Sequence, residues 1–157
     1  MEIGNHLKTT HILKKNNMRK TLSEYSINNL KGVHPKLVEI IEKGISSSPF
    51  YYVVYLGVID RDYQYMLYSY GRNIENTKFY TDKDGFKKKS VFQLDKDTKY
   101  GHGVQLVIFN PSSPNYIDYS EEKQLELGEY LVKFAKAMGV ILDYRVTIRG
   151  LEVFFGI

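Results

Sequence analysis

Residues 101–114 read Gly-His-Gly-Val-Gln-Leu-Val-Ile-Phe-Asn-Pro-Ser-Ser-Pro, and this stretch decides the fold. Residues 104–109 are an almost unbroken apolar run, with glycine before it and Asn-Pro-Ser-Ser-Pro after it. A short apolar run between turn-forming residues is typical of a strand that is buried on both faces. We therefore expect residues 104–109 to form a central strand of a sheet.

Helix and strand patterns precede this strand. Pro35 suits the first position of a helix in which the apolar residues recur at helical spacing. Residues 50–58 are β-branched and aromatic, which favours a strand. Asp60 can cap a further helix that Gly71 would end, with one face formed by Tyr63, Met66, Leu67 and Tyr70. Residues 73–97 are polar and rich in lysine, and we expect them to form a long surface excursion.

The sequence after residues 104–109 predicts a long helix and two strands. Ser120, with two glutamates behind it, is placed to cap a helix that ends at Gly139. Its inward face would carry Leu127, Leu131, Phe134 and Met138. Residues 140–142 and 153–155 are two further strand candidates. The mixture of helices and strands predicts an α+β fold.

Length and charge predict one domain with a basic extension. The 157 residues are enough for one globular core, which we assign to residues 21–157. Residues 1–20 hold five basic residues and one acidic residue, whereas residues 21–157 are neutral. We expect residues 1–20 to be a flexible basic extension.

The composition also limits the location and the metal chemistry. The chain has no cysteine, so any zinc site would need histidine and carboxylate ligands, and only four histidines are present. It has no apolar run long enough to span a bilayer and no apolar leader. We therefore expect no membrane span and a location in the bacterial cytoplasm.

The sequence resembles the small zinc peptidases of the D-Ala-D-Ala carboxypeptidase superfamily, in particular the L-alanyl-D-glutamate endolysins of tailed phages. The similarity begins with Leu-Ser-Glu-Tyr-Ser at 22–26 and Leu-Lys-Gly-Val-His-Pro-Lys-Leu-Val at 30–38, and includes Ser-Pro-Phe at 48–50. It continues in Gln-Tyr-Met-Leu-Tyr-Ser-Tyr-Gly-Arg-Asn at 64–73. The resemblance implies a zinc-peptidase-like fold with a central, mainly antiparallel sheet flanked by helices.

The functional positions of that family are replaced in this chain. The family's motif Glu-Gly-x-Arg-Thr is matched by residues 56–60, so Leu56 stands for its acidic residue and Ile59 for its arginine. In the zinc-binding motif, Thr98 stands for the histidine and Gln105 for the aspartate. A neutral amide oxygen and a hydroxyl are poor substitutes as zinc ligands.

The C-terminal ligand and the general base are also replaced. Phe154 falls at the family's third ligand and Thr147 near its base, and no histidine occurs after His102. Ile59, Phe154 and two further apolar residues, Val107 and Phe155, would partly fill the former active site. We expect neither a metal nor another cofactor. The alternative is a zinc site rebuilt around His102, which would retain peptidase activity.

The interpretation we favour is a catalytically inactive endolysin-like pseudoenzyme of phage or prophage origin that binds a host or phage protein. Tyrosine, present 14 times, is common at interfaces, although an AT-rich genome explains its abundance equally well. The binding candidates are Arg72, Tyr100, His102, Gln105 and Tyr144. The chain could also self-associate.

Two alternatives stay open. The first is a peptidoglycan-binding protein or a cryptically active L-alanyl-D-glutamate endopeptidase. The second is a nucleic-acid-binding protein that uses the basic extension together with Lys87, Lys88 and Lys89.

Overall fold

The computed structural model describes residues 20–156 of the chain. The basic extension predicted for residues 1–20 lies outside these described residues except for Lys20, whose ammonium group donates a hydrogen bond to the carbonyl oxygen of Ser48. No helix within residues 20–156 has the length and apolar character needed to cross a bilayer.

The centre of the fold is a five-stranded sheet in the order β1-β2-β5-β4, with β3 paired to the end of β2. All strand pairs are antiparallel. Every residue of β2 is buried, and β2 lies between β1 and β5, which confirms the central strand expected at residues 104–109. The strands are β1 (Tyr52–Leu56), β2 (Gly103–Phe109), β3 (Ile117–Asp118), β4 (Leu142–Thr147) and β5 (Gly150–Phe155).

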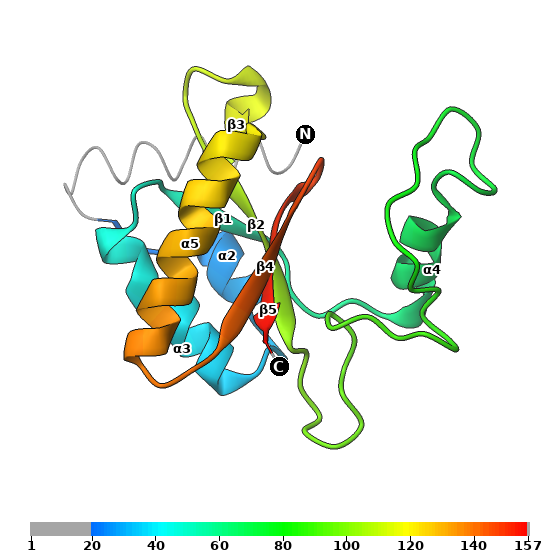
Figure 1. Cartoon of the computed structure of the whole chain (residues 1–157), viewed down its shortest axis with the longest axis horizontal. Helices are drawn as coiled ribbons and strands as arrows, with labels where there is room; N and C mark the ends of the chain where they lie inside the picture. Colours follow the sequence, from blue (N-terminus) through cyan, green and yellow to red (C-terminus); the bar gives the residue numbers. More distant parts are fainter. Residues whose placement is uncertain (1–19, 157) are drawn as a thin grey trace.

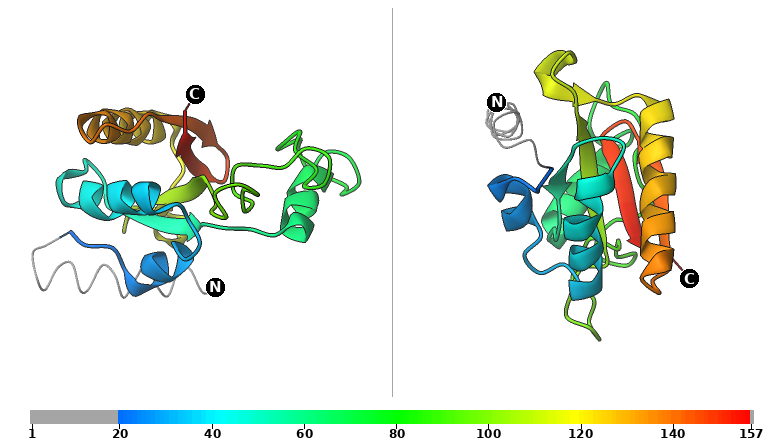
Figure 2. Two further views of the ribbon diagram at one scale, coloured as in Figure 1. Left: turned by 90° about the horizontal axis from the view of Figure 1, so that it is seen from below. Right: turned by 90° about the vertical axis from the view of Figure 1, so that its left-hand side faces the viewer.

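Helices lie on both sides of the sheet. The α-helices are α2 (Glu24–Asn29), α3 (Pro35–Gly44), α4 (Arg61–Ser69) and α5 (Glu121–Ala137). Two short 3₁₀ turns, η1 (Ile45–Ser47) and η2 (Pro114–Tyr116), follow α3 and precede β3. Figures 1 and 2 show α3 and α5 against one face of the sheet, while α2 packs near β1. The α+β class with a central antiparallel sheet flanked by helices is thus confirmed.

The main core lies between these helices and the sheet. Pro35 occupies the start of α3, as predicted, and the ring of His34 caps the helix by accepting a hydrogen bond from the backbone N–H of Lys36. Apolar residues at helical spacing in α3 and α5 are fully buried against alternate residues of β2 and β5. These core residues include Leu37, Ile40, Ile41, Leu127 and Leu131 from the helices and Val104, Leu106, Leu151 and Val153 from the strands.

The opposite side of the sheet faces a lobe, which we define as residues 57–102 between β1 and β2. The lobe carries α4 and otherwise consists of turns and irregular chain, as expected for the lysine-rich excursion. Figure 1 shows it extending away from the sheet on the side remote from α3 and α5. Asp60 caps α4 as predicted, because its carboxylate accepts a hydrogen bond from the N–H of Tyr63 at 2.8 Å.

The buried face of α4 differs from the expectation in one residue, Met66. Met66 is 37% exposed, whereas Gln64 is only 2% exposed. Gln64 lies three residues before the buried Leu67 and therefore on the same face of the helix. A search for apolar periodicity could not select this position, because glutamine is polar.

The start of α5 also differs in its cap. Ser120 is the N-cap residue, but its side chain forms no capping hydrogen bond. The polar contacts gather instead on Asp118, which accepts hydrogen bonds from Lys123 Nζ at 2.6 Å, the Ser120 N–H at 2.9 Å and Asn110 Nδ2 at 3.1 Å. These bonds, that of Lys123 foremost, hold the pKa of the Asp118 carboxyl well below its usual range.

We expect Asp118→Asn to destabilise the protein at neutral pH and to have a smaller effect at pH 3. A carboxyl whose pKa is lowered by folding contributes its full stability above its unfolded pKa of about 3.8, and this contribution declines below that pH and is lost as the pH falls through the much lower folded pKa. The difference in the free energy of unfolding should be about 1–2 kcal/mol at pH 7. Urea unfolding at pH 7 and at pH 3 measures it, with the exposed Asp97→Asn as the control. An equal deficit at both pH values would contradict the assignment.

Candidate functional site

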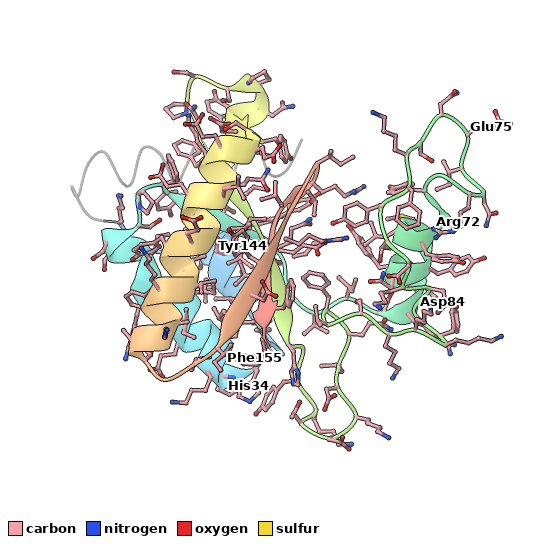
Figure 3. The ribbon with its side chains drawn as sticks, viewed as in Figure 1. His34, Arg72, Glu75, Asp84, Tyr144 and Phe155 are labelled. Atoms are coloured by element: carbon pink, nitrogen blue, oxygen red, sulfur yellow. The ribbon has the colours of Figure 1, made fainter. Side chains whose placement is uncertain are left out.

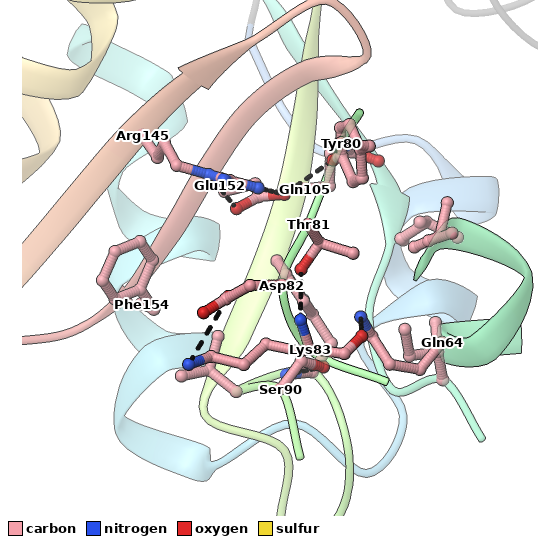
Figure 4. A pocket seen from close by; sticks show the side chains of 15 residues that line it. Gln64, Tyr80, Thr81, Asp82, Lys83, Ser90, Gln105, Arg145, Glu152 and Phe154 are labelled. Carbon is pink, nitrogen blue, oxygen red and sulfur yellow. Dashed lines mark hydrogen bonds and ion pairs between the residues drawn. The ribbon is translucent and has the colours of Figure 1, made fainter. Parts of the chain in front are cut away.

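A cavity of about 230 Å³ lies between the lobe and the exposed end of the sheet (Figure 4). The strands supply one wall and the lobe supplies the other. The lining residues are Leu56, Ile59, Gln64, Leu67, Tyr80, Thr81, Asp82, Lys83, Ser90, Val91, Phe92, Gln105, Arg145, Glu152 and Phe154.

Strand register brings the sheet residues of this wall together. Gln105 of β2 is paired with Leu56 of β1 on one side and with Glu152 of β5 on the other. Glu152 is in turn paired with Arg145 of β4. Paired residues on neighbouring strands point to the same face, and the residues on either side of them point to the helices. One row of side chains across four strands therefore forms the floor of the cavity.

A polar network ties this row to the lobe. The Arg145 guanidinium donates two hydrogen bonds to the Glu152 carboxylate, at 3.0 and 3.1 Å. The Tyr80 hydroxyl donates to Glu152 Oε2 at 2.6 Å and accepts from Gln105 Nε2 at 3.0 Å. Burial, together with the neighbouring Glu152 carboxylate, raises the pKa of Tyr80 well above its usual range. The phenol therefore stays protonated and acts as a donor to Glu152.

Two buried glutamines, Gln64 from the lobe and Gln105 from the sheet, are among the lining residues, and one end of each side-chain amide has no partner within residues 20–156. Gln64 Nε2 donates to the carbonyl oxygen of Lys83 at 2.8 Å, and Gln105 Nε2 donates to Tyr80. The Oε1 atoms of both glutamines are buried and have no hydrogen-bond partner within residues 20–156. The cavity thus has a largely apolar lining, and the two unpaired oxygens are buried behind it.

Four of the six positions at which the resemblance implies lost function line this cavity. They are Leu56, Ile59, Gln105 and Phe154. The other two lie elsewhere. Thr98 is exposed in a turn that is closed by Asp95, and its hydroxyl contacts His102 Nε2 at 2.8 Å. Thr147 ends β4 and donates a hydrogen bond to the carbonyl oxygen of Gly150 at 2.8 Å.

The expected apolar filling of the site is only partly realised. Ile59 and Phe154 line the cavity, whereas Val107 lies in the main core and Phe155 packs against histidine rings. Val107 lies two residues beyond Gln105 along β2, past the cavity wall, and Phe155 follows Phe154 directly, so its side chain points to the other face of β5.

Tyr100 and His102 belong to a separate aromatic group. The His34 ring lies 5.5 Å from the Tyr100 ring, 5.8 Å from that of His102 and 5.0 Å from that of Phe155, all edge to face. Within the part of the chain that the structure describes, no three His, Cys, Asp or Glu side chains are grouped so that they could hold a metal ion. The His102 ring packs against those of His34 and Phe155.

Arg72 and Tyr144 also lie outside the cavity (Figure 3). Arg72 is in the lobe, where its guanidinium lies over the Tyr68 ring at 3.8 Å and donates to the carbonyl oxygen of Thr81. Tyr144 of β4 points to the helix side of the sheet. A methyl group on Gly128 of α5 would lie 2.5 Å from its ring, which shows how closely the two elements pack.

The arrangement of elements is similar to that of a solved structure, the L-Ala D-Glu endopeptidase ChiX of Serratia marcescens. The TM-score is 0.59 at 17% sequence identity, and the match covers 90% of this chain and 94% of that one. The fold is similar to that of an L-Ala-D-Glu endopeptidase. No protein-family model matches the endopeptidase-like chain, and no curated protein matches its sequence.

The cavity of this endopeptidase-like fold does not fit the zinc ion that the resemblance implies. Phe154 has no donor atom, and Gln105 offers only a neutral amide oxygen. The two lining carboxylates are paired with cations, Glu152 with Arg145 and Asp82 with Lys83. Zinc sites in proteins are built from cysteine, histidine and free carboxylates, and the lining contains neither cysteine nor histidine.

Sequence reasoning did not select Gln64, Tyr80, Arg145 or Glu152 as site residues. A signal for two of them was present. The chain turns between Thr147 and Gly150, and a hairpin closed at these residues places Arg145 opposite Glu152. Tyr80 had no comparable signal, because it lies in the irregular part of the lobe, 72 residues from its partner Glu152.

Proposed function

We propose that this endopeptidase-like chain does not hydrolyse peptides and acts by binding another protein. The composition of the cavity lining supports the proposed lack of peptide hydrolysis. Leu56, Ile59, Gln105 and Phe154 stand where the resemblance implies an acidic residue, an arginine and two zinc ligands, and all four lie together in one cavity. None of them can supply a general base or a negatively charged metal ligand.

The exposed surface of the lobe supports the proposed binding to another protein. Eight of the thirteen large hydrophobic side chains that are exposed within residues 20–156 lie in the lobe, although the lobe is a minority of those residues. Exposed aromatic and aliphatic groups gathered on one part of a protein are typical of an interaction surface. The eight are Tyr65, Met66, Ile74, Phe79, Phe86, Val91, Leu94 and Tyr100. The resemblance to phage endolysins makes a protein of the infected bacterium, or of the phage, the expected partner.

The first test is hydrolysis. The purified protein is incubated with peptidoglycan and with an L-Ala-γ-D-Glu peptide, with and without added Zn²⁺, and new amino groups are measured against an active L-Ala-D-Glu endopeptidase. We expect no release above the blank in either condition. Zinc-dependent release would contradict the proposal and support a cryptically active endopeptidase.

The second test is binding through the lobe. Phe79→Ser/Phe86→Ser removes two of the most exposed lobe side chains, and Ile141→Ser/Ile148→Ser removes two even more exposed ones outside it. A partner captured by cross-linking in host cells should be lost with the lobe variant and kept with the control variant. Equal capture by both variants would show that the lobe is not the binding surface.

A further inference from the structure

Arg149 lies in the turn between β4 and β5, where neighbouring residues fix its backbone. The Thr147 hydroxyl accepts a hydrogen bond from the Arg149 N–H at 3.0 Å and donates to the carbonyl oxygen of Gly150 at 2.8 Å. Gly150 has a φ of +125°, and a methyl group on it would lie 2.5 Å from the carbonyl oxygen of Leu106 in β2. The turn is therefore closed by its own hydrogen bonds and packed tightly on the sheet, so the Arg149 side chain starts from a fixed position.

Arg149 differs from the other arginines of residues 20–156 in its burial and its partners. Arg145 is paired with a carboxylate, Arg72 donates to two backbone carbonyl oxygens, and Arg61 is exposed. Arg149 is the one arginine of the four that is partly buried, and its guanidinium donates a hydrogen bond to the Tyr70 hydroxyl at 3.0 Å. No carboxylate within the described part of the chain forms an ion pair with it. A partly buried cation without a counter-ion is unfavourable, because it has lost part of its hydration.

Tyrosine rings hold the guanidinium in place. Its central carbon lies 4.8 Å from the centre of the Tyr70 ring and 5.6 Å from that of the Tyr80 ring. Tyr80 is itself fixed, because its hydroxyl donates to Glu152 at 2.6 Å. An arginine held against aromatic rings loses little further freedom when it binds a ligand. Arg149 is thus ordered in advance, while most of its N–H groups have no acceptor within residues 20–156.

The phenols of Tyr55, Tyr63 and Tyr119 lie close to this guanidinium and come from three different elements. Tyr55 is at the β-bulge of β1, Tyr63 is in the first turn of α4, and Tyr119 precedes the N-cap of α5. Partial burial raises the pKa of Tyr63 and of Tyr119, the neighbouring Tyr55 phenol adds to this rise, and the positive charge of Arg149 opposes it. The hydroxyls of Tyr63 and Tyr119 therefore keep their protons at neutral pH. Neither has a hydrogen-bond partner among the described residues, so both can donate to a ligand.

The charges around Arg149 favour a ligand with a single negative charge. Arg145 and Arg149 both lie beside the Tyr80 ring, but Arg145 is paired with Glu152 and only Arg149 is left to bind an anion. A dianion such as phosphate would bring a second negative charge near Glu152 without a second free cation. The two oxygens of a carboxylate match two parallel N–H groups of a guanidinium, and their remaining lone pairs can accept from the phenols.

We propose that Arg149, together with the hydroxyls of Tyr63 and Tyr119, is a binding site for one carboxylate. The carboxylate belongs either to a small organic acid or to an acidic side chain of a polypeptide, and the same groups recognise it in both. The site uses none of the eight exposed lobe residues that we assign to protein binding. It does not depend on the proposed lack of hydrolysis or on the lobe surface.

Butanoate and butanamide are suitable probes, because they have the same shape and differ in charge. NMR titrations of the full chain are followed through the side-chain Nε–H signal of Arg149, which is assigned by its loss in Arg149→Gln. Butanoate should bind saturably with a dissociation constant on the order of millimolar, and more weakly as the NaCl concentration rises. Butanamide should bind at least tenfold more weakly. Equal binding of the two probes, or an Arg149 signal that does not move, would overturn the proposal.

A peptide probe distinguishes the two sources of the carboxylate. Acetyl-Gly-Glu-Gly-amide presents the group from a polypeptide, and acetyl-Gly-Gln-Gly-amide is its uncharged counterpart. Tighter binding of the Glu peptide than of butanoate would identify a polypeptide as the ligand, and tighter binding of butanoate would identify a small acid. In the first case the Gln peptide should bind at least tenfold more weakly than the Glu peptide, and equal binding of the two peptides would contradict recognition of the carboxylate.

Variants of the arginines test whether the site or only the net charge matters. Arg149→Gln should lower butanoate affinity at least tenfold. Arg61→Gln is the matched control, because Arg61 also lies beside an aromatic ring, that of Phe86 at 5.3 Å, and its loss changes the net charge equally. A loss of affinity in the control as large as that in Arg149→Gln would overturn the assignment to Arg149.

Variants of the phenols test the site without removing a charge. Tyr63→Phe/Tyr119→Phe keeps both rings and removes both hydroxyls, so butanoate affinity should fall at least threefold. Tyr65→Phe/Tyr100→Phe is the control, because it removes two exposed hydroxyls whose rings contact other groups. An unchanged affinity in the first variant, or an equal fall in both, would overturn the role of the two phenols.

Discussion

Gly57→Ala should destabilise the folded protein by roughly 3–5 kcal/mol, because the added methyl group would overlap backbone and the backbone would have to move. Gly57 joins β1 to the lobe, and a methyl group on it would lie 1.9 Å from the backbone carbonyl oxygen of Asn29 at the end of α2. No side-chain rotation relieves this overlap. The chain must instead move α2 away from β1, which breaks the hydrogen bonds from Asn29 Nδ2 to the carbonyl oxygens of Val54 and Tyr55.

Urea unfolding followed by circular dichroism measures this effect. Gly139→Ala is the control, because a methyl group there meets nothing within 4 Å and only the positive φ of +78° is unfavourable. That variant should lose about 1–2 kcal/mol. If Gly57→Ala cost no more than Gly139→Ala, the close approach of α2 and β1 would be wrong.

Arg145→Leu should be the second strongly destabilising change, by about 2–4 kcal/mol. It removes two hydrogen bonds from the Glu152 carboxylate, whose side chain is only 7% exposed, and leaves Tyr80 as its remaining donor. A buried carboxylate that has lost its cation is costly. The half-exposed position of Arg145 reduces the cost below that of a fully buried pair.

A double-mutant cycle tests the pairing. Arg145→Leu/Glu152→Leu removes both charges, and we expect it to recover most of the stability that Arg145→Leu loses. The free energies of unfolding of the wild type, the two single variants and the double variant give the coupling directly. A double variant as unstable as the sum of the single changes would show that the two residues do not depend on each other.

The fold was largely predictable because its main elements carry local patterns. The apolar run at 104–109 became β2, and Pro35 and the apolar spacing after it became α3. The helix after Ser120 ends at Ala137, close to the predicted limit at Gly139. Core residues of a helix or strand lie on one face of it, so apolar residues recur at the period of that element and the sequence shows which residues are buried.

The candidate site was predictable only where it lies on these elements. Leu56, Gln105 and Phe154 meet because strand pairing brings β1, β2 and β5 side by side. Thr98 was placed with them by its position in the motif, but the irregular end of the lobe holds it in an exposed turn. Tyr80 was missed because no regular element in the lobe determines where residues 73–97 dock.

The amino-acid sequence alone shows which chemical groups this protein has. It contains no cysteine, no histidine after His102, and uncharged residues at the positions that resemble zinc ligands. The folded chain is needed to show that Arg145 and Tyr80 donate to Glu152, whereas the Oε1 atoms of Gln64 and Gln105 have no donor within residues 20–156. The physical reason is that hydrogen bonding in a buried site depends on neighbours from distant parts of the chain, and side-chain identity alone does not specify them.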